Sequence, residues 1–271
     1  MRYWKGSIAL SSTRDYPLLR HVLQSGSITH NQLFELLKLD YYASSRKAFN
    51  NRVLRLVKHG LLIRCERLIA SRDVVYCMSA SAALALRASG NPFNYSTPSA
   101  TSSITDRQLH HSLDLNDIHL TLKRTGSLVY WMPETEVRSR NDLTPYGYCK
   151  HYDAVVVVRL GGQDCRFALE YERTPKAARD YAVIRERLDQ ETFVRHFLYL
   201  VPNHDFLWFI AEKLSQCKRA VYIGLLQEFL QQALALQVRR AGSPATLPLA
   251  SVLAPGREVQ HSGELFSGVA V

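Results

Sequence analysis

The chain has 271 residues, of which 46% are hydrophobic, and a formal net charge of +10. This length allows two modest domains, each with a core of its own. No apolar run approaches the roughly 18 residues of a membrane-spanning helix, and the first residues lack the apolar region of a secretory signal peptide. We therefore expect a cytoplasmic protein with no membrane partner.

The positive charge is concentrated in the first part of the chain. Residues 1–100 contain 14 Lys and Arg against 5 Asp and Glu, whereas residues 101–271 contain 20 against 19. A basic module joined to a neutral one favours a polyanionic partner, because phosphates that are neutralised release their counterions. Charge alone would also fit a basic surface that serves only solubility, so the pattern of the elements has to decide.

The cysteines indicate neither disulfides nor a zinc site. They are odd in number and widely spaced: Cys65, Cys77, Cys149, Cys165 and Cys217. None belongs to a CxxC motif or lies at zinc-ligand spacing from a histidine. We expect reduced thiols, most of them packed in the core.

Three amphipathic helices are predicted in the first sixty residues. The segments with apolar residues at helical spacing are 15–24, 31–39 and 44–59. Thr29 is in place to cap the second helix, and Ser44 or Ser45 to cap the third, which Gly60 ends.

Two apolar runs follow the helices, over 61–64 and 74–77, with a polar turn between them. They predict a two-stranded hairpin. Three helices followed by a hairpin is the order of a winged helix-turn-helix domain, and residues 52–62 resemble the passage from recognition helix to wing in that family. We expect this domain to occupy residues 1–90.

The third helix has two faces. Phe49, Val53 and Leu56 form an apolar stripe, and polar side chains point elsewhere. A helix fits the major groove of DNA, where Arg, Lys and Asn reach phosphates and base edges. The candidate DNA contacts are Arg46, Lys47, Asn50, Arg52 and Arg55, with Arg72 in the turn of the hairpin. Winged helices also dock on proteins, so a role in protein interaction alone stays open.

A second domain is predicted over 105–241. A stretch rich in Ser, Thr and Pro at 91–104 indicates a linker, and residues 242–271 lack sustained periodicity, so we expect a disordered tail. The elements predicted in this domain are helices at 106–124, 205–214 and 227–236, a helix capped by Thr174 with Pro175 as its first residue, and strands at 128–131, 154–158, 165–171, 193–201 and 220–225. The predicted fold class is α+β, with a winged helix followed by an α/β domain that contains a mixed sheet.

The hairpin around Gly161-Gly162 is expected to bring carboxylates together. If the glycines form a two-residue loop, Asp153 lies opposite Glu170, and Glu172 points to the same face. Like charges at this separation repel and make a cation a natural occupant; oxygen ligands suit Mg²⁺ or Mn²⁺. A three-residue loop would destroy the shared face. The alternative is that these carboxylates only end their strands and meet Arg and Lys partners.

Several short motifs occur in order between residues 105 and 230. They are His111–Asp117, Trp131–Glu134, Tyr152–Ala154 and Ala168–Lys176, with Arg179 and Tyr181 behind them. In order and spacing these motifs resemble the replication-relaxation family of plasmid and integrative-element proteins. They are also similar to plasmid mobilisation relaxases of the MOB-C class. With the winged helix in front, the resemblance covers most of the chain.

The resemblance implies a restriction-endonuclease-like core of the PD-(D/E)XK type. It implies that Asp153 and Glu170 are catalytic metal ligands and that Lys176 stabilises charge in the transition state or positions the nucleophile. The candidate catalytic residues are therefore Asp153, Glu170, Glu172 and Lys176. Two positions depart from the family pattern: Tyr152 stands in place of the usual proline, and Glu172 stands where a lysine would complete the motif. If Lys176 does not replace that lysine, the fold would bind DNA without cutting it.

Other polar residues of the motifs have less defined roles. His111 and Asn116 lie about 140° apart on the predicted helix and need not act together. His111 is a candidate proton carrier, with capping or packing as the alternative. The possible covalent nucleophiles are Tyr146, Tyr148, Tyr171 and Tyr181, and nothing in the sequence singles one out.

These expectations describe a bacterial DNA-processing protein of a mobile genetic element, acting in plasmid replication or mobilisation. The winged helix would locate the site, and the second domain would nick one strand with Mg²⁺ or Mn²⁺ held by carboxylates. A non-catalytic DNA-binding regulator and a protein-binding adaptor are the rival interpretations. The partners considered are DNA, other replication or transfer proteins, and a second copy of the chain.

Overall fold

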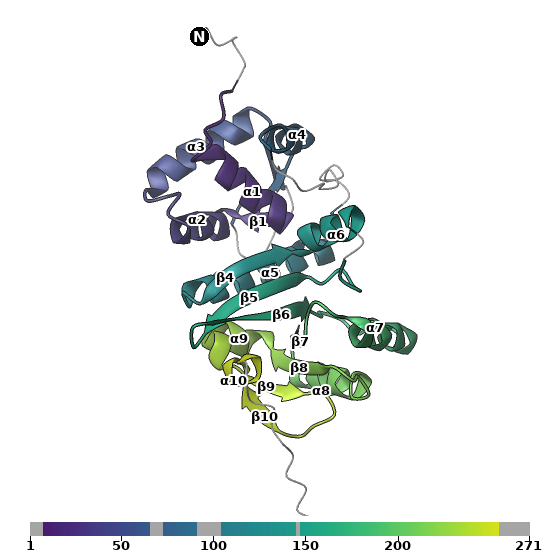
Figure 1. Cartoon of the computed structure of the whole chain (residues 1–271). Helices are drawn as coiled ribbons and strands as arrows, with labels where there is room; N and C mark the ends of the chain where they lie inside the picture. The colour runs from purple at the N-terminus through teal and green to yellow at the C-terminus, as the bar shows by residue number, and fades with distance from the viewer. Residues whose placement is uncertain (1–7, 66–72, 91–103, 145–146, 255–271) are drawn as a thin grey trace, which may run out of the picture.

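The computed structural model describes residues 8–65, 73–90, 104–144 and 147–254. The described residues up to 90 form an N-terminal unit, and those from 104 onward form a sheet unit, which lies below it in Figure 1. Within these ranges no helix is long and apolar enough to cross a membrane. The linker predicted at 91–104 lies outside the described residues except for Ile104.

The N-terminal unit combines helices with a small antiparallel sheet. Its elements are α1 (Asp15–Ser25), β1 (Ser27–Thr29), α2 (His30–Leu39), α3 (Arg46–Lys58), β2 (Leu62–Cys65), β3 (Val75–Met78) and α4 (Ala80–Ala88). The strand order is β1-β3-β2. Helices α1 to α3 and the hairpin β2–β3 lie where the sequence predicts them. The pattern does not reveal β1 or α4, because three residues are too few for periodicity and α4 consists mostly of Ala and Ser.

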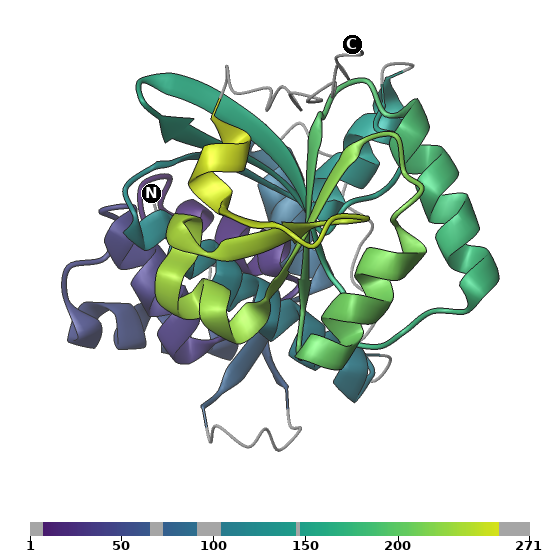
Figure 2. The same cartoon turned by 90° about the horizontal axis from the view of Figure 1, so that it is seen from below.

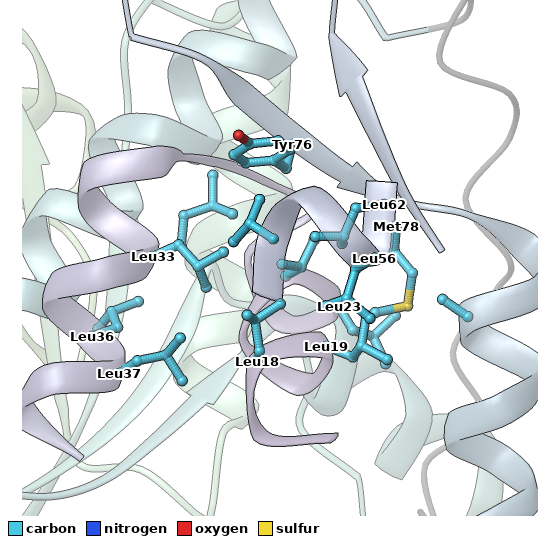
Figure 3. Close-up of a cluster of buried hydrophobic side chains, with 14 of the residues drawn as sticks. Leu18, Leu19, Leu23, Leu33, Leu36, Leu37, Leu56, Leu62, Tyr76 and Met78 are labelled. Carbon is cyan, nitrogen blue, oxygen red and sulfur yellow. The ribbon is translucent and has the colours of Figure 1, made fainter. Parts of the chain in front are cut away.

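Leucines of the first three helices form the core of this unit. Figure 3 shows them gathered around the strand residues Tyr76 and Met78. Leu18, Leu33 and Leu56, one from each helix, are fully buried. These residues belong to the apolar stripes from which the helices are predicted, so burial of the stripes accounts for the packing of the three helices.

The sheet unit is built on seven strands. Its elements are α5 (Asp106–Arg124), β4 (Leu128–Pro133), α6 (Glu134–Leu143), β5 (Ala154–Leu160), β6 (Gln163–Tyr171), α7 (Ala178–Gln190), β7 (His196–Val201), α8 (His204–Lys213), β8 (Ala220–Leu225), α9 (Leu226–Gln232), β9 (Gln237–Arg240), β10 (Thr246–Pro248) and α10 (Leu249–Leu253). The strand order is β10-β9-β8-β7-β6-β5-β4. β6, β7 and β8 are parallel neighbours, and the other pairs are antiparallel. The predicted α+β class with a mixed sheet is therefore confirmed.

Helices cover both faces of this sheet, which Figure 2 shows nearly edge-on. On one face, Ile184 of α7 and Ile210 of α8 are buried in a common cluster. On the other, Ile118 of α5, Phe229 of α9 and Leu249 of α10 form a second cluster. The strands in the middle are consequently buried on both sides, as their continuous apolar sequences require.

Helix α7 begins at Ala178, later than predicted. Thr174 does not cap the helix, whose N-cap position is Ala177; the Thr174 hydroxyl instead accepts a hydrogen bond from Arg107 of α5. The backbone N–H of Lys176 donates to the hydroxyl of Tyr181 at 3.2 Å. The prediction of a Thr174 cap is therefore wrong, and Lys176 lies in the segment before the helix rather than in its first turn.

The tail predicted to be disordered is ordered as far as the structure describes it. β10 pairs with β9, and α10 follows directly. Leu249 and Leu253 are buried, and the N–H of Leu249 donates to the carbonyl of Leu236 at 2.8 Å. A helix of five residues is too short for a recognisable periodicity, which explains the wrong prediction. Residues 255–271 lie outside the described residues.

Helix α5 joins the two units. Leu120 is buried in the core of the N-terminal unit, whereas Ile118 and Leu122 are buried against the sheet. Two buried polar side chains complete this contact. Asn116 Nδ2 donates to the carbonyl of Ser27 at 2.8 Å, and Gln32 Nε2 donates to the carbonyl of Leu113 at 2.9 Å and to Asp117 Oδ1 at 2.7 Å. The apolar periodicity of the sequence could not have predicted these hydrogen bonds, because they join polar side chains of one unit to the other unit.

Gln32 has a double role that can be measured. It also forms a capping box with Thr29 at the start of α2. Gln32→Ala therefore removes the bond that Gln32 Oε1 accepts from the N–H of Thr29, keeps the bond from the backbone N–H of residue 32 to the Thr29 hydroxyl, and leaves buried partners on α5 unsatisfied. We expect a loss of about 2–3 kcal/mol in the free energy of unfolding, measured by urea denaturation. Gln108→Ala is the control, because Gln108 forms the same capping box with Thr105 at an exposed position and should lose less than about 1 kcal/mol. Equal losses would show that the bonds to α5 add nothing.

Candidate active site

A two-residue turn sets the register of β5 and β6. Gly161 and Gly162 have φ angles of +56° and +81°. Positive φ at both central positions is typical of a type I′ turn, which suits glycine. The pairing then runs without interruption to Ala154 opposite Leu169. The register predicted from the two glycines is confirmed.

This register places the two predicted metal ligands side by side. One residue beyond the last pair, Asp153 lies opposite Glu170. Ala168, two residues before Glu170 on β6, belongs to the cluster on the α7 and α8 face, so Glu170 points toward that face. Asp153, just before the start of β5, contacts His111 of α5 at the end of the sheet. Glu172 follows Glu170 at the same spacing and is also buried.

All four predicted catalytic residues line one pocket of about 270 Å³: Asp153, Glu170, Glu172 and Lys176. The pocket lies at the carboxyl end of β6, a parallel strand, which is where open α/β sheets bind ligands. Arg107 and His111 of α5 and Arg173 after β6 complete its wall. The sequence does not predict Arg107 or Arg173 as site residues, because only the packing of α5 against the sheet brings the first near the second.

Asp153 is held from two sides. Its Oδ1 lies 3.1 Å from His111 Nε2, and its Oδ2 accepts a hydrogen bond of 2.7 Å from the N–H of Tyr171. Burial opposes ionisation, but these contacts outweigh it and lower the pKa of Asp153. Burial likewise opposes protonation of His111, and the bond to Asp153 raises the pKa of that imidazole. The His111 ring stacks on Tyr171, with centroids 5.6 Å apart.

Glu170 is the carboxylate of the two whose ionisation is opposed more strongly by its surroundings. Its side chain is 7% exposed, and its Oε1 forms an ion pair with Lys150 but has no other hydrogen-bond partner among the described residues. Burial raises the pKa of Glu170 to about 7; the charge of Asp153 adds to the rise, and Lys150 opposes it. Lys150 also lies 5.6 Å from the ring centre of Tyr152. No sequence motif marks Lys150, because it precedes β5 in a loop without periodicity.

The third carboxylate is paired as well. Glu172 forms an ion pair with Lys176, four residues further along the chain. Burial lowers the pKa of Lys176, and Lys150 contributes to this, whereas Glu170 opposes it. Arg173 lies 3.5 Å from Asp114 of α5. Carboxylates and cations therefore alternate across the pocket, as expected for a site that handles a charged group in partial isolation from water.

The donor set fits a divalent cation through two carboxylates. Among the described residues there is no group of three or more His, Cys, Asp and Glu side chains placed to hold a metal. Mg²⁺, however, is usually bound by one or two carboxylates, with waters and substrate phosphates as the remaining ligands. Asp153 and Glu170 supply hard oxygen ligands of this kind, and the buried Oε1 of Glu170 has only Lys150 as partner.

Other motif residues have structural positions. Asn116 and Asp117 bond to the N-terminal unit, and Tyr152 is fully buried with its hydroxyl donating to Glu191 at 2.9 Å. Of the four candidate nucleophiles, Tyr171 lines the pocket, whereas Tyr181 does not line it and is buried with its hydroxyl accepting a hydrogen bond from the N–H of Lys176. Tyr148 packs against Tyr152 and Phe193, and Tyr146 lies outside the described residues.

The candidate DNA contacts on α3 differ in how exposed their side chains are and in whether those side chains already have partners within the protein. Arg46 and Lys47 are exposed, and Arg46 Nη2 donates to Asn31 at 2.9 Å. Asn50 is half-buried and bonds to His30 Nε2 at 2.9 Å. Arg52 and Arg55 both lean toward Asp15 of α1. Arg72 lies outside the described residues.

Comparison with known proteins places the chain in a family. A search of curated proteins gave no match. Among solved structures, the chain is similar to the restriction endonuclease FokI bound to DNA, with 11% identity and a TM-score of 0.26 over 83% of this chain and 45% of that one. Such a low score supports no conclusion about fold or activity. The sequence model of the replication-relaxation family, in contrast, matches residues 19–196, more than half of the chain. The chain therefore belongs to the replication-relaxation family.

Proposed function

We propose that this protein processes DNA for a mobile genetic element, by nicking one strand in a metal-dependent reaction during plasmid replication or mobilisation. The observation that carries the proposal is the pocket at the end of β6, where Asp153, Glu170 and Glu172 meet Arg107, Arg173 and Lys176. Membership of the replication-relaxation family supports a role in DNA processing. A PD-(D/E)XK-like nuclease core, in which Lys176 takes the place of the motif lysine, is part of the proposal; in the non-catalytic alternative the same nuclease fold is degenerate.

Each group of the pocket has a chemical task in this proposal. Asp153 and Glu170 would hold Mg²⁺ or Mn²⁺, and the bound cation would supply Lewis-acid activation of the attacking oxygen and charge stabilisation for the leaving oxygen. Arg107 and Arg173 bind the oxygens of the scissile phosphodiester, because guanidinium groups match phosphate geometry. Lys176 stabilises the charge that develops on the phosphate. His111, whose pKa is raised by Asp153, holds a proton at Nε2.

The N-terminal unit would bring DNA to this pocket. Its order of helices followed by a two-stranded hairpin supports the proposal of a winged helix, in which α3 would be the recognition helix. Lys47 and Arg46 are exposed on α3, and residues 1–100 carry nearly all the net positive charge. The buried bonds between α2 and α5 would hold the DNA-binding face and the pocket in a fixed relation.

A second candidate function is a non-catalytic DNA-binding regulator or scaffold of replication or transfer. One observation favours it: Lys150 pairs with Glu170, and Lys176 pairs with Glu172, so lysines already neutralise two carboxylates. A pure protein-binding adaptor is the third possibility, and it predicts no affinity for DNA. Other replication or transfer proteins and a second copy of the chain would be partners in any of the three.

The three functions give different results in two measurements. For the nickase, supercoiled plasmid should be converted to open circles with Mg²⁺ or Mn²⁺ and not with EDTA, and Ca²⁺, Mg²⁺ or Mn²⁺ should raise the melting temperature. The regulator should bind DNA in a salt-dependent manner without either metal effect. The plasmid should carry the DNA that flanks the coding sequence of this protein. Absence of nicking and of any metal-dependent shift would exclude the nickase, and absence of DNA binding at low salt would leave the adaptor.

A further inference from the structure

A second pocket lies in the N-terminal unit, far along the chain from the candidate active site. It has a volume of about 420 Å³ and is formed where the start of α1 approaches the middle of α3. Its charged wall consists of Arg14 and Asp15 from the α1 side and Arg52 and Arg55 from α3. Three guanidinium groups thus face one carboxylate, and two positive charges have no counter-charge among the residues that line the pocket.

Asp15 supplies a single negative charge and cannot balance the three arginines, although its Oδ1 has no hydrogen-bond partner among the described residues. It is 1% exposed; Arg55 Nη2 lies 2.5 Å from its Oδ2, which also accepts a hydrogen bond of 2.8 Å from the N–H of Ser11. Arg52 Nε is more distant, 3.9 Å from Asp15 Oδ1. Burial lowers the pKa of Arg52, and the charges of Arg14 and Arg55 lower it further, while Asp15 opposes this. The three arginines therefore repel one another around a single acceptor.

The guanidinium of Arg52 has an unused donor. Its side chain is 13% exposed, and its Nη1 is buried with no hydrogen-bond partner among the described residues. A buried unsatisfied donor on a charged group is costly, so it indicates a partner that is absent here. Ser11, Thr13 and Asn51 add neutral polar groups to the same pocket. Guanidinium, hydroxyl and amide donors around one cavity match the oxygens of a phosphate.

We propose that this pocket binds one phosphate of the DNA backbone beside α3. The inference rests on the proposed DNA binding by the N-terminal unit and assigns Arg14, Arg52 and Arg55 to a backbone contact rather than to base edges. DNA is favoured over a free anion because Ala48 and Asn51 line the pocket and are also on the exposed face of α3. A duplex lying on that face would bring its backbone to the pocket.

Arg14→Ala provides the cleanest test, because Arg14 is exposed and its loss does not disrupt the buried contacts of Asp15. One phosphate contact contributes about 0.9 to the slope of log affinity against log salt. We expect Arg14→Ala to flatten this slope by about that amount, so a fourfold rise in salt costs the variant about 3.5-fold less affinity than the wild type. Arg20→Ala is the matched control: Arg20 is also an exposed arginine of α1, but it does not line the pocket.

Three results overturn the proposal in distinguishable ways. Equal slopes for Arg14→Ala, Arg20→Ala and the wild type would remove the phosphate contact and leave DNA binding intact. A wild type that does not bind DNA at low salt would refute the proposed function itself. A melting temperature that rises with millimolar inorganic phosphate in the wild type but not in Arg14→Ala, together with equal DNA slopes, would identify a free-anion site. Arg52→Gln, once circular dichroism has shown that it is folded, should flatten the salt dependence of DNA affinity as Arg14→Ala does.

Discussion

Glu170→Gln should be more stable than the wild type above neutral pH, and the difference should vanish toward pH 4. In the folded protein burial raises the pKa of Glu170 from 4.5 to about 7. The folded state therefore binds this proton more tightly than the unfolded state, and the stability that it contributes is present below pH 4.5 and is lost as pH rises through 7. Glutamine resembles the neutral acid and has no proton to lose.

The size of the difference in the free energy of unfolding follows from the rise in the pKa of Glu170. Each pKa unit corresponds to about 1.4 kcal/mol, so the variant should gain a few kcal/mol, on the order of 3, at pH 8 relative to pH 4. Urea denaturation at pH 4, 6 and 8 measures it. Glu186→Gln is the control, since Glu186 is exposed on α7 and should change little at any pH. Parallel curves for the wild type and Glu170→Gln would contradict the raised pKa.

A divalent cation should offset the loss of stability that ionised Glu170 causes in the folded protein above neutral pH. If Mg²⁺ binds between Asp153 and Glu170, it favours the ionised carboxylate, and the stability of the wild type at pH 8 should rise toward that of Glu170→Gln. The variant has one ligand fewer and should respond less. An equal response of both proteins would mean that the cation binds elsewhere.

The arrangement of Asp153 and Glu170 could be predicted because it depends on local chemistry. Gly161-Gly162 permits the positive φ angles of a two-residue turn, and once the turn length is known, the pairing of every residue on the two strands follows. Helix α5 was predictable for a similar reason, since Thr105 and Gln108 form a capping box at its start.

The rest of the site depends on contacts between distant segments. Lys150 reaches Glu170 from an irregular loop, and Arg107 reaches the pocket from α5, so no periodicity or spacing connects either residue with the carboxylates. The Thr174 cap also depends on a distant segment: helix α7 begins only at Ala178, and the Thr174 hydroxyl accepts a tertiary hydrogen bond from Arg107. Local preference gives way where a charged partner from another element competes for the same atom.

Asp153→Asn should abolish nicking while the protein stays folded and bound to DNA. Asparagine keeps the shape and can still accept the hydrogen bond from the N–H of Tyr171, but it lacks the charge that holds a cation. Loss of a single preorganised electrostatic contact typically costs about 10²–10³ in rate, and a metal ligand should cost at least that much. The measurement is the initial rate of open-circle formation with Mn²⁺, with DNA affinity determined in parallel by fluorescence anisotropy.

Lys150→Met distinguishes the nickase from the regulator, because Lys150 and a metal ion compete for Glu170. In the nickase, removal of the ammonium leaves Glu170 without its ion-pair partner. The variant should therefore be less stable without metal and should bind Mn²⁺ more tightly, seen as a larger rise in melting temperature at equal Mn²⁺. In the regulator, Lys150 is the permanent partner of Glu170. The same variant would then lose stability, with no recovery in Mn²⁺, because breaking a buried pair leaves a charge with no replacement partner. A destabilised Lys150→Met that Mn²⁺ does not restore, combined with an Asp153→Asn that behaves like the wild type on plasmid DNA, would rule out the metal-dependent reaction.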